Sequence, residues 1–581
     1  MDPSTCETRG TALMDEASIT NRIERQLDGK AYAWIEHHVI VDESRNTLSG
    51  KHDSSSSPEA SSGHPSRCWT PRINGVSAVG LESSYRSRLA FIFALVVSRS
   101  AVAGGPLGNN GDPIETSRYS IDFYQGPIYS GSRVVGLGGA YVAVAEDVDG
   151  NLQNAAAPAV RPYYSIDYFD YSLGLAIAYP PDIENLDFFN SGSPTAVRGS
   201  DDNFLFATPA MNLQWGTFGL GVTAEIQSYA FESSGNQAPG SVQPQLGMVV
   251  STLHLQAANA FYDHQLVVGL GSRILVQAVE ATTEEDARDL FSSQGSGLEV
   301  GVLYRPENLP FRLGFAAREA IETSPRFKKD LLPDDAGDIT IPSGDAILYL
   351  PEQVSTPWDV NVGAAVQFGR EFNPRWRHSE DEAERAILYY RSRELDREYE
   401  RETRLLQAKD EAEREAIEAE LDRAQERDDE LLEKAIDNAR QLIRLRNAES
   451  QRSYLLLSTS LLISGRAYEA VGVDAFLSQV VNRSGERAVY SPRLGAESEV
   501  WPNLVRLRAG TYLEPTRFET SSPRWHGTLG LDVRLLRWSV FGLWPDDYLW
   551  RLGVSADVSQ RYAVGGLSIG GWYPRLAKSP F

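Results

Sequence analysis

The sequence predicts an all-β protein: a transmembrane antiparallel β-barrel of about 14 to 16 strands, with an inserted α-helical hairpin. Apolar side chains recur at every second position from about Tyr163 onward, which is the period of a β-strand. No run approaches the roughly 18 to 20 apolar residues that a membrane-spanning helix needs. In a bilayer, strands satisfy all their backbone N–H and C=O groups only when the sheet closes. About 350 residues are available for strands of about ten residues and their connections, which gives the strand count.

The two faces of these strands differ in polarity. In Trp358–Phe368, one face carries Trp, Val, Val, Ala, Val and Phe, and the other carries Asp, Asn, Gly, Ala and Gln. The alternation recurs over Phe218–Gln227 and Val505–Glu514, where the second face carries charges. A soluble sandwich or propeller also alternates, but a sandwich packs its apolar face on a second sheet.

Aromatic residues near the strand ends favour the barrel over that alternative, because transmembrane barrels carry aromatic girdles at both membrane interfaces. The residues concerned are Trp501, Tyr512, Trp525, Trp538, Trp544, Trp550, Trp572 and Tyr573. The final residue, Phe581, resembles the terminal aromatic of the assembly signal of outer-membrane barrels. We therefore expect the chain to lie in a bacterial outer membrane, in contact with outer-membrane lipid.

A secretory signal is predicted at residues 86–103. Arg86 and Arg88 precede the apolar run Leu89–Val97, and Ala101-Val102-Ala103 forms a cleavage site before Gly104. A buried strand or helix is the alternative for the apolar run. Because signals begin at an N-terminus, residues 1–85 are interpreted as a start site placed too far upstream or as a disordered extension. A real cytoplasmic pre-segment is the alternative.

Charge and cysteine content exclude several classes of function. The formal net charge of −24 argues against a nucleic-acid partner, because phosphate binding relies on Lys and Arg. Cys6 and Cys68 both precede the predicted cleavage site. The mature chain would therefore hold neither a disulfide framework nor a thiolate metal site, and we predict no cofactor and no metal.

A helical hairpin is predicted over residues 376–450, between barrel segments 161–370 and 451–581. Residues 379–450 contain no Gly or Pro. Their apolar positions fit heptad a and d sites interrupted by Asp428 and Asn438, although a solvated helix held by charge pairs fits as well. The apolar positions are Ile417, Leu421, Ala424, Leu431, Ala435, Leu442 and Leu445.

The hairpin must fold back because both ends return to strands, with its turn near Lys409–Glu413 or near Glu426–Asp429. Alternation of connection lengths predicts that it lies on the periplasmic side, where barrels have short turns. It would then offer a docking surface to a periplasmic protein partner. Short turns are predicted at Gly216, His264 and 305–310, and long loops at Glu232–Pro244, Glu280–Gln294 and Ile321–Thr356.

The segment ahead of the strands resembles the start of FadL-type channels and their PorV-like relatives. Gly131–Asp147 holds a Gly-Gly-Ala stretch that leads to an acidic site, and Asn154-Ala155-Ala156-Ala157-Pro158 replaces the Asn-Pro-Ala element of that family. Barrel segments such as Gly301–Pro306 and Pro492–Glu497 look like the family too.

The resemblance implies that residues 104–160 form an N-terminal hatch that plugs the barrel lumen. It also implies passive uptake of hydrophobic small molecules such as long-chain fatty acids or hydrocarbons. PorV-like members are instead non-conducting barrels that bind a protein partner in secretion or envelope assembly, and the inserted hairpin favours that alternative. The predicted hatch residues are Gly136, Gly138, Gly139, Ala140, Asp147, Asn154 and Pro158.

Enzymatic signals are weak, and we predict no enzyme. Gly566-Leu567-Ser568-Ile569-Gly570 matches G-x-S-x-G, but it lies in a Gly-rich final strand rather than on a strand-to-helix turn. His254, His264 and His526 have no metal-ligand spacing. Gly136–Gly139 is not a phosphate loop, since no Lys-Ser or Lys-Thr follows it. An outer-membrane lipase that gathers Ser568 and a histidine from distant strands stays open.

Overall fold

A computed structural model describes residues 107–572, with gaps at 162–164, 166–167, 181–185, 193–203, 233–244, 283–286, 328–332, 334–336, 344–345, 377–378, 450–452, 520 and 540–548. The predictions for residues 1–85, for the signal at 86–103, for both cysteines and for Tyr573 and Phe581 lie outside the described residues.

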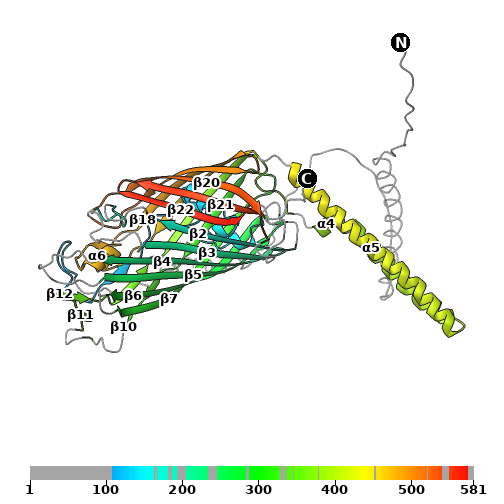
Figure 1. The fold of residues 1–581 in the computed structure, drawn as a ribbon, viewed down its shortest axis with the longest axis horizontal. Helices are drawn as coiled ribbons and strands as arrows, with labels where there is room; N and C mark the ends of the chain where they lie inside the picture. The colour runs from blue at the N-terminus through cyan, green and yellow to red at the C-terminus, as the bar shows by residue number, and fades with distance from the viewer. Residues whose placement is uncertain are drawn as a thin grey trace, which may run out of the picture. The chain divides into compact units, whose positions relative to one another are not determined.

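Fourteen antiparallel strands form a closed barrel, which confirms the predicted fold class and the lower end of its strand count. Each strand pairs with its neighbours in sequence, and β2 pairs with β22 to close the ring (Figure 1). The wall consists of β2 (Phe169–Tyr179), β3 (Phe204–Trp215), β4 (Phe218–Glu232), β5 (Gln245–Phe261), β6 (Leu266–Thr282), β7 (Ala287–Tyr304), β8 (Phe311–Arg318), β14 (Asp359–Gly369), β15 (Tyr454–Ser464), β18 (Val489–Trp501), β19 (Val505–Glu514), β20 (Arg524–Arg537), β21 (Leu549–Ser559) and β22 (Tyr562–Gly571).

The polarity of the wall is the reverse of that of a soluble protein. On β14, Val362 and Phe368 are 49% and 54% exposed on the outside, whereas Asn361 and Gln367 are buried on the inside. On β19, Leu507 faces outward, and Arg506 and Arg508 are buried inside. An apolar outer face on a closed barrel is the structure that a bilayer requires. The chain is an outer-membrane β-barrel.

Two of the predicted girdle residues are wrong. Tyr512 is fully buried and Trp572 is 1% exposed, whereas Trp501 and Trp525 are both 61% exposed. Tyr512 shares its inward-facing parity with Arg508 on β19, so its ring points into the lumen. Trp572 packs under the guanidinium of Arg506, 4.2 Å from its centre.

The barrel has two unlike ends. At the short-turn end, residues 216–217, 262–265, 305–310 and 502–504 connect strands. At the long-loop end, residues 180–203, 233–244, 319–358 and 465–488 connect them. The long loop predicted at Glu280–Gln294 is wrong: β6 and β7 continue as a ladder to Thr282 and Ala287, and only residues 283–286 separate them.

A hydrophobic cap covers the long-loop end. β1 (Ser120–Asp122) pairs in parallel with β13 (Gln353–Thr356) and β16 (Ala470–Gly472), and β9 (Ile321–Thr323) and β17 (Arg483–Ser484) complete this sheet. Ile121, Val354 and Val471 are fully buried. α6 (Val473–Ser478) packs in the same core. Three further short strands are β10 (Arg326–Phe327), which pairs with β7, and the two-stranded pair β11 (Thr340–Ser343) and β12 (Ala346–Tyr349).

From this cap the N-terminal segment runs through the lumen before it enters β2. It forms α3 (Ser132–Gly136) and two short 3-10 helices, η1 (Val148–Gly150) and η2 (Ala157–Ala159). α3 contacts β19 to β22, and η2 contacts β3 to β6. The segment therefore touches opposite parts of the wall within a single barrel.

The inserted hairpin consists of α4 (Ser379–Gln407) and α5 (Glu411–Glu449) between β14 and β15 (Figure 1). The turn at residues 408–410 confirms the first of the two predicted positions. Neither helix is both long and apolar enough to cross a membrane.

The predicted heptad seam of the hairpin is partly wrong. Ile417 and Leu421 are buried, but Leu431 and Leu442 are 46% and 54% exposed. Asp428 is not an interruption: it is 4% exposed and forms ion pairs with Arg393 and Arg397 of α4. A buried ion pair thus takes the place of an apolar layer between the two helices. Beyond it, the buried side of α5 continues at Ala439 and Ile443.

Candidate functional site: the plugged lumen

The first group of predicted hatch residues lies against β18 to β20. Gly136 ends α3, where an added Cβ would lie 2.8 Å from the Cα of Gly530. Gly138 and Gly139 have φ angles of +59° and +70°, a region that glycine enters without a Cβ clash. Ala140 is 1% exposed in the turn that follows. This tight turn reverses the chain inside the lumen.

The second group of predicted residues lies farther along the segment. Asn154 Nδ2 donates to the carbonyl oxygens of Val142 (2.9 Å) and Val302 (3.2 Å), so it joins two parts of the hatch to β7. Pro158 accepts a 2.7 Å hydrogen bond from Gln214 Nε2 of β3 through its carbonyl oxygen. Asp147 is half-buried, with a φ of +57°. All seven predicted residues lie in the N-terminal segment that runs through the barrel. Their role as a hatch stays a prediction.

The wall lacks side chains where the hatch backbone touches it. A Cβ on Gly269 would lie 2.0 Å from the carbonyl oxygen of Ala155, and one on Gly301 would lie 2.0 Å from Asn154 Oδ1. Heavy atoms cannot approach so closely, so only glycine permits this contact. Gly219 is similar, with Pro158 O at 2.1 Å. The inner wall is therefore shaped to the hatch.

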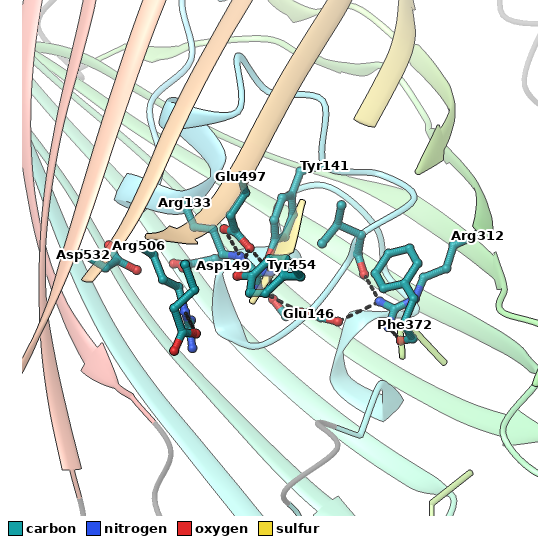
Figure 2. A network of polar contacts seen from close by, with 12 residues as sticks. Arg133, Tyr141, Glu146, Asp149, Arg312, Phe372, Tyr454, Glu497, Arg506 and Asp532 are labelled. Carbon is teal, nitrogen blue, oxygen red and sulfur yellow. Dashed lines mark hydrogen bonds and ion pairs between the residues drawn. The ribbon is translucent and has the colours of Figure 1, made fainter. Parts of the chain in front are cut away.

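A buried ionic network joins the hatch to the wall. Arg133 of α3 donates to both carboxylate oxygens of Glu497 on β18, through Nε (2.8 Å) and Nη2 (2.9 Å) (Figure 2). Glu497 also accepts from Arg508 Nε at 2.5 Å and from the Tyr454 hydroxyl at 2.7 Å. Both side chains of the Arg508–Glu497 pair are completely buried.

A second branch of the network centres on Asp532 of β20. It accepts from Arg508 (2.7 Å), from Arg551 (3.1 Å) and from the hydroxyl of Ser132 (2.7 Å). Arg551 also donates to Asp149 of the hatch at 2.5 Å. Two hatch residues, one at each end of residues 132–149, are thus fixed to the same face of the wall.

Glu146 extends the network across the lumen. Its two oxygens accept from Arg133 and from Arg312 of β8, both at 2.8 Å (Figure 2). Because β8 and β18 lie apart in the ring, the hatch bridges two regions of the wall. Removing one partner of a buried pair costs more than the pair itself contributes, since the other charge stays buried.

His254, His526 and Ser568 lie buried inside the barrel, each with polar partners. Ser568 Oγ donates to Ser132 Oγ at 2.9 Å, so it holds the hatch. His254 lies between Glu225 (3.2 Å) and Glu299 (3.1 Å), and His526 lies between Asp557 (2.7 Å) and Glu514 (2.6 Å). Among the described residues, no group of three or more His, Cys, Asp or Glu could hold a metal ion.

Two cavities lie between the hatch and the long-loop end. The outer one, of about 50 Å³, is lined by Asp122, Glu514 and Arg517 and by six aromatic residues: Phe123, Tyr124, Tyr129, Phe188, Phe189 and Phe518. The inner one, of about 150 Å³, shares Phe123, Tyr124 and Tyr129 and adds polar side chains such as Glu225 and Arg273. The shared residues make the cavities neighbours.

The wall beside the inner cavity has a break in its hydrogen-bond ladder. β3 and β4 pair up to Ala207 and Ile226 and again from Ala210 and Thr223, but Thr208 and Pro209 have no partner on β4. Proline cannot donate to a ladder. Within the described chain, the buried Thr208 hydroxyl also has no hydrogen-bond partner. Glu225, which lines the inner cavity, lies opposite this break.

A third cavity, of about 40 Å³, lies at the short-turn end. Burial, and next the positive charge of Arg312, lower the pKa of the Arg305 guanidinium to about 9. Burial, followed by the charges of Arg305 and Arg161, lowers the pKa of His264 to about 4. Burial is the larger cause of both shifts, and the neighbouring arginine charges act in the same direction.

The ionic network was not predicted as a site, although signals for it exist. Arg506 and Arg508 were recognised on the inward face, and Arg133 and Glu146 stand in the segment that resembles the FadL-type start. What the sequence lacks is the pairing, because Arg133 and Glu497 lie 364 residues apart.

Comparisons with known proteins agree with the predicted resemblance at the level of structure. The CymD monoaromatic hydrocarbon channel matches with 10% identity over 77% of this chain and 98% of its own, at a TM-score of 0.40. A Pseudomonas aeruginosa FadL homologue matches with 12% identity over 80% and 100% (TM-score 0.38). The deltaS2S3 mutant of the TodX monoaromatic hydrocarbon channel matches with 11% identity over 76% and 97% (TM-score 0.39).

No protein-family model matches the sequence, and no curated protein matches it either. The similarity to FadL-type channels is therefore one of structure alone. TM-scores below 0.5 say nothing about what this chain transports.

We expect Glu497→Gln to lower the free energy of unfolding by about 3 kcal/mol. The substitution leaves Arg133 and Arg508 buried with one carboxylate partner fewer. Urea unfolding of the refolded chain in micelles, followed by tryptophan fluorescence, measures the change. Glu420→Gln is the control, because it removes an exposed pair with Arg404 on the hairpin. Equal losses in the two variants would contradict a structural role for the buried network.

We expect Gly269→Val to displace the hatch while the barrel still forms. The new side chain would occupy the position of the Ala155 carbonyl oxygen. Proteoliposomes holding this variant should swell faster in small sugars than those holding the unchanged chain. Gly527→Val is the matched control, since no atom lies within 4 Å of its Cβ position. Unchanged swelling with Gly269→Val would show that the contact does not seal the lumen.

Proposed function

We propose that this chain is an outer-membrane channel for passive uptake of hydrophobic small molecules, such as long-chain fatty acids or hydrocarbons, with the segment at 104–160 as its hatch. The observation that carries the proposal is the pair of adjoining cavities above the plugged part of the lumen. An open porin would need no such closed compartments, and a structural barrel would have no use for an aromatic entrance.

The lining of the outer cavity suits apolar ligands. Tyr129 and Phe188 stack with 6.2 Å between ring centres, and Phe188 and Phe189 pack edge to face at 5.2 Å. Aromatic faces bury large apolar areas without requiring a specific partner. We infer that a hydrophobic molecule first leaves the external solvent here.

The break in the wall at Thr208 and Pro209 gives such a molecule a second route besides the lumen axis. Two residue pairs without ladder bonds weaken the wall between the inner cavity and the lipid. An apolar ligand would gain by leaving through this side, because the hatch below it is dense with ions.

The PorV-like alternative has one observation in its favour, the inserted hairpin. Several of its large apolar side chains are exposed: Leu395 is 62%, Tyr399 is 75% and Leu406 is 85% exposed. They lie at positions that repeat along one side of α4. A periplasmic protein partner could cover them, in which case the barrel would serve as an anchor.

Uptake by cells that lack their own channel for such molecules tests the proposal. Cells that produce this chain should take up labelled laurate and labelled toluene faster than cells without it. Replacing residues 379–449 by a short Gly-Asn turn should leave this uptake unchanged, because Gly369 and Tyr454 already pair as strand neighbours.

No uptake by cells with a folded barrel would overturn the channel and favour the non-conducting, partner-binding alternative. Uptake that disappears with the hairpin would show that the channel depends on the hairpin.

A further inference from the structure

The cavity at the short-turn end is lined by six arginines drawn from the hatch and from the connections and ends of the strands. They are Arg133, Arg161, Arg305, Arg312, Arg370 and Arg506. The volume of about 40 Å³ would admit about three water-sized groups at ~10 to 15 Å³ each. A carboxylate, or part of a phosphate, is of this size.

Five of these arginines lie over aromatic rings, and three of the five do so within 4.2 Å of the ring centre. Arg312 lies 3.9 Å over Phe372, Arg370 lies 4.2 Å over Tyr454, and Arg506 lies 4.2 Å over Trp572. Stacking uses the flat face of a guanidinium, whereas its N–H groups lie in the plane and point outward at the edge. The rings therefore hold the three guanidinium groups in place around the cavity, where their positive charges attract an oxyanion. The N–H groups of Arg312 already donate to Asn373, Glu146 and two backbone carbonyls.

The stacking contacts with aromatic rings do not account for the burial of Arg305. It is 5% exposed, and its one hydrogen bond to the described residues goes to the carbonyl oxygen of Arg161 at 3.4 Å. It forms no ion pair with any described carboxylate. A buried guanidinium with five N–H groups needs more acceptors than one distant carbonyl.

Carboxylates in the lining do not supply those acceptors. Glu146 is already shared between Arg133 and Arg312, and Glu371 is exposed to solvent. Asp147 is the remaining carboxylate, and it forms no ion pair with a described residue. Arginines thus outnumber carboxylates around the cavity by six to three.

We propose that the cavity at the short-turn end is an oxyanion-binding site, in which Arg305 is the principal donor and the surrounding arginines supply positive charge. The ligand is a carboxylate or phosphate group. It is either free in solution or the head group of an amphiphile. If the channel function proposed above holds, the site would receive the acid head of a fatty acid at the periplasmic side; this role, unlike the site itself, rests on that function.

Calorimetric titration of the refolded full chain in non-ionic micelles tests the site. The probes are inorganic phosphate, laurate and the uncharged dodecanol. We expect phosphate or laurate to bind, and dodecanol to bind at least tenfold more weakly than laurate. Binding of phosphate would identify a site for free oxyanions. Binding of laurate without phosphate would identify a head-group site.

Variants distinguish anion binding in this cavity from anion binding by surface charge in general. Arg305→Gln should weaken anion binding about tenfold or more, the effect of one lost charge-assisted hydrogen bond. Asp147→Asn should strengthen it, because a negative charge leaves the lining. Arg375→Gln is the matched control, since Arg375 also lies at the short-turn end, after β14, but has an exposed side chain outside the cavity. It should leave the affinity unchanged.

The proposal is overturned if the folded chain binds neither anion, if Arg305→Gln and Arg375→Gln bind equally well, or if Asp147→Asn does not raise the affinity. The last variant keeps its parent fold and adds no buried charge, so it decides the matter even if Arg305→Gln fails to fold. Binding in micelles needs no transport. A failed uptake experiment would therefore rule out a role of the site in transport, but it would not rule out the binding site itself.

Discussion

The need to pair every backbone N–H and C=O group within a bilayer governs this structure. Fourteen strands meet that need by pairing in a ring that has no edge. The ring then sets the polarity of every side chain, since alternate residues meet lipid and lumen. Leu507 and Arg508 differ by one position along β19, yet one lies in an apolar solvent and the other in a buried ionic network.

Polar side chains line the lumen, so a segment that fills it must provide hydrogen-bond and ion-pair partners for them. The N-terminal segment does so with a small number of ions, Arg133, Glu146 and Asp149, and with backbone groups that lie against glycines. The hydrophobic cap at the long-loop end is of a different kind, because it packs Ile121, Val354 and Val471 in an apolar core, with the buried pair Asp122–Arg517 at its edge. One end of the lumen is therefore closed by apolar packing and the middle by ion pairs. Ion pairs can exchange partners with water or with a ligand, so the middle is the part suited to rearrangement.

Sequence patterns predicted the barrel well because period-two alternation is local and repeats in every strand. They also predicted the hairpin and its turn, since residues 379–450 contain no Gly or Pro. They placed the segment around Gly136 to Pro158 ahead of the barrel, but they could not show that Asn154 reaches Val302. Pairing between residues hundreds of positions apart leaves no trace in a single sequence.

The errors have physical causes of the same kind. Tyr512 and Trp572 were assigned to the membrane girdle because aromatic residues at strand ends favour interfaces. The in-out alternation of β19 instead turns Tyr512 into the lumen, and Trp572 packs beneath the guanidinium of Arg506. Asp428 was read as a break in the heptad, whereas Arg397 on the facing helix makes it part of the seam. In each case a partner outside the local pattern decided where the side chain lies.

If the chain is the channel proposed here, the N-terminal segment must move for a ligand to pass. Ser132 and Ser568 face each other with 2.9 Å between their oxygens, so cysteines at both positions can form a disulfide that ties α3 to β22. Uptake of labelled laurate should be measured for this Ser132→Cys, Ser568→Cys chain, with Cys6 and Cys68 changed to Ser, before and after reduction. Loss of uptake when the disulfide is formed, and recovery when it is reduced, is the expected result. Equal uptake in both states would contradict a moving hatch.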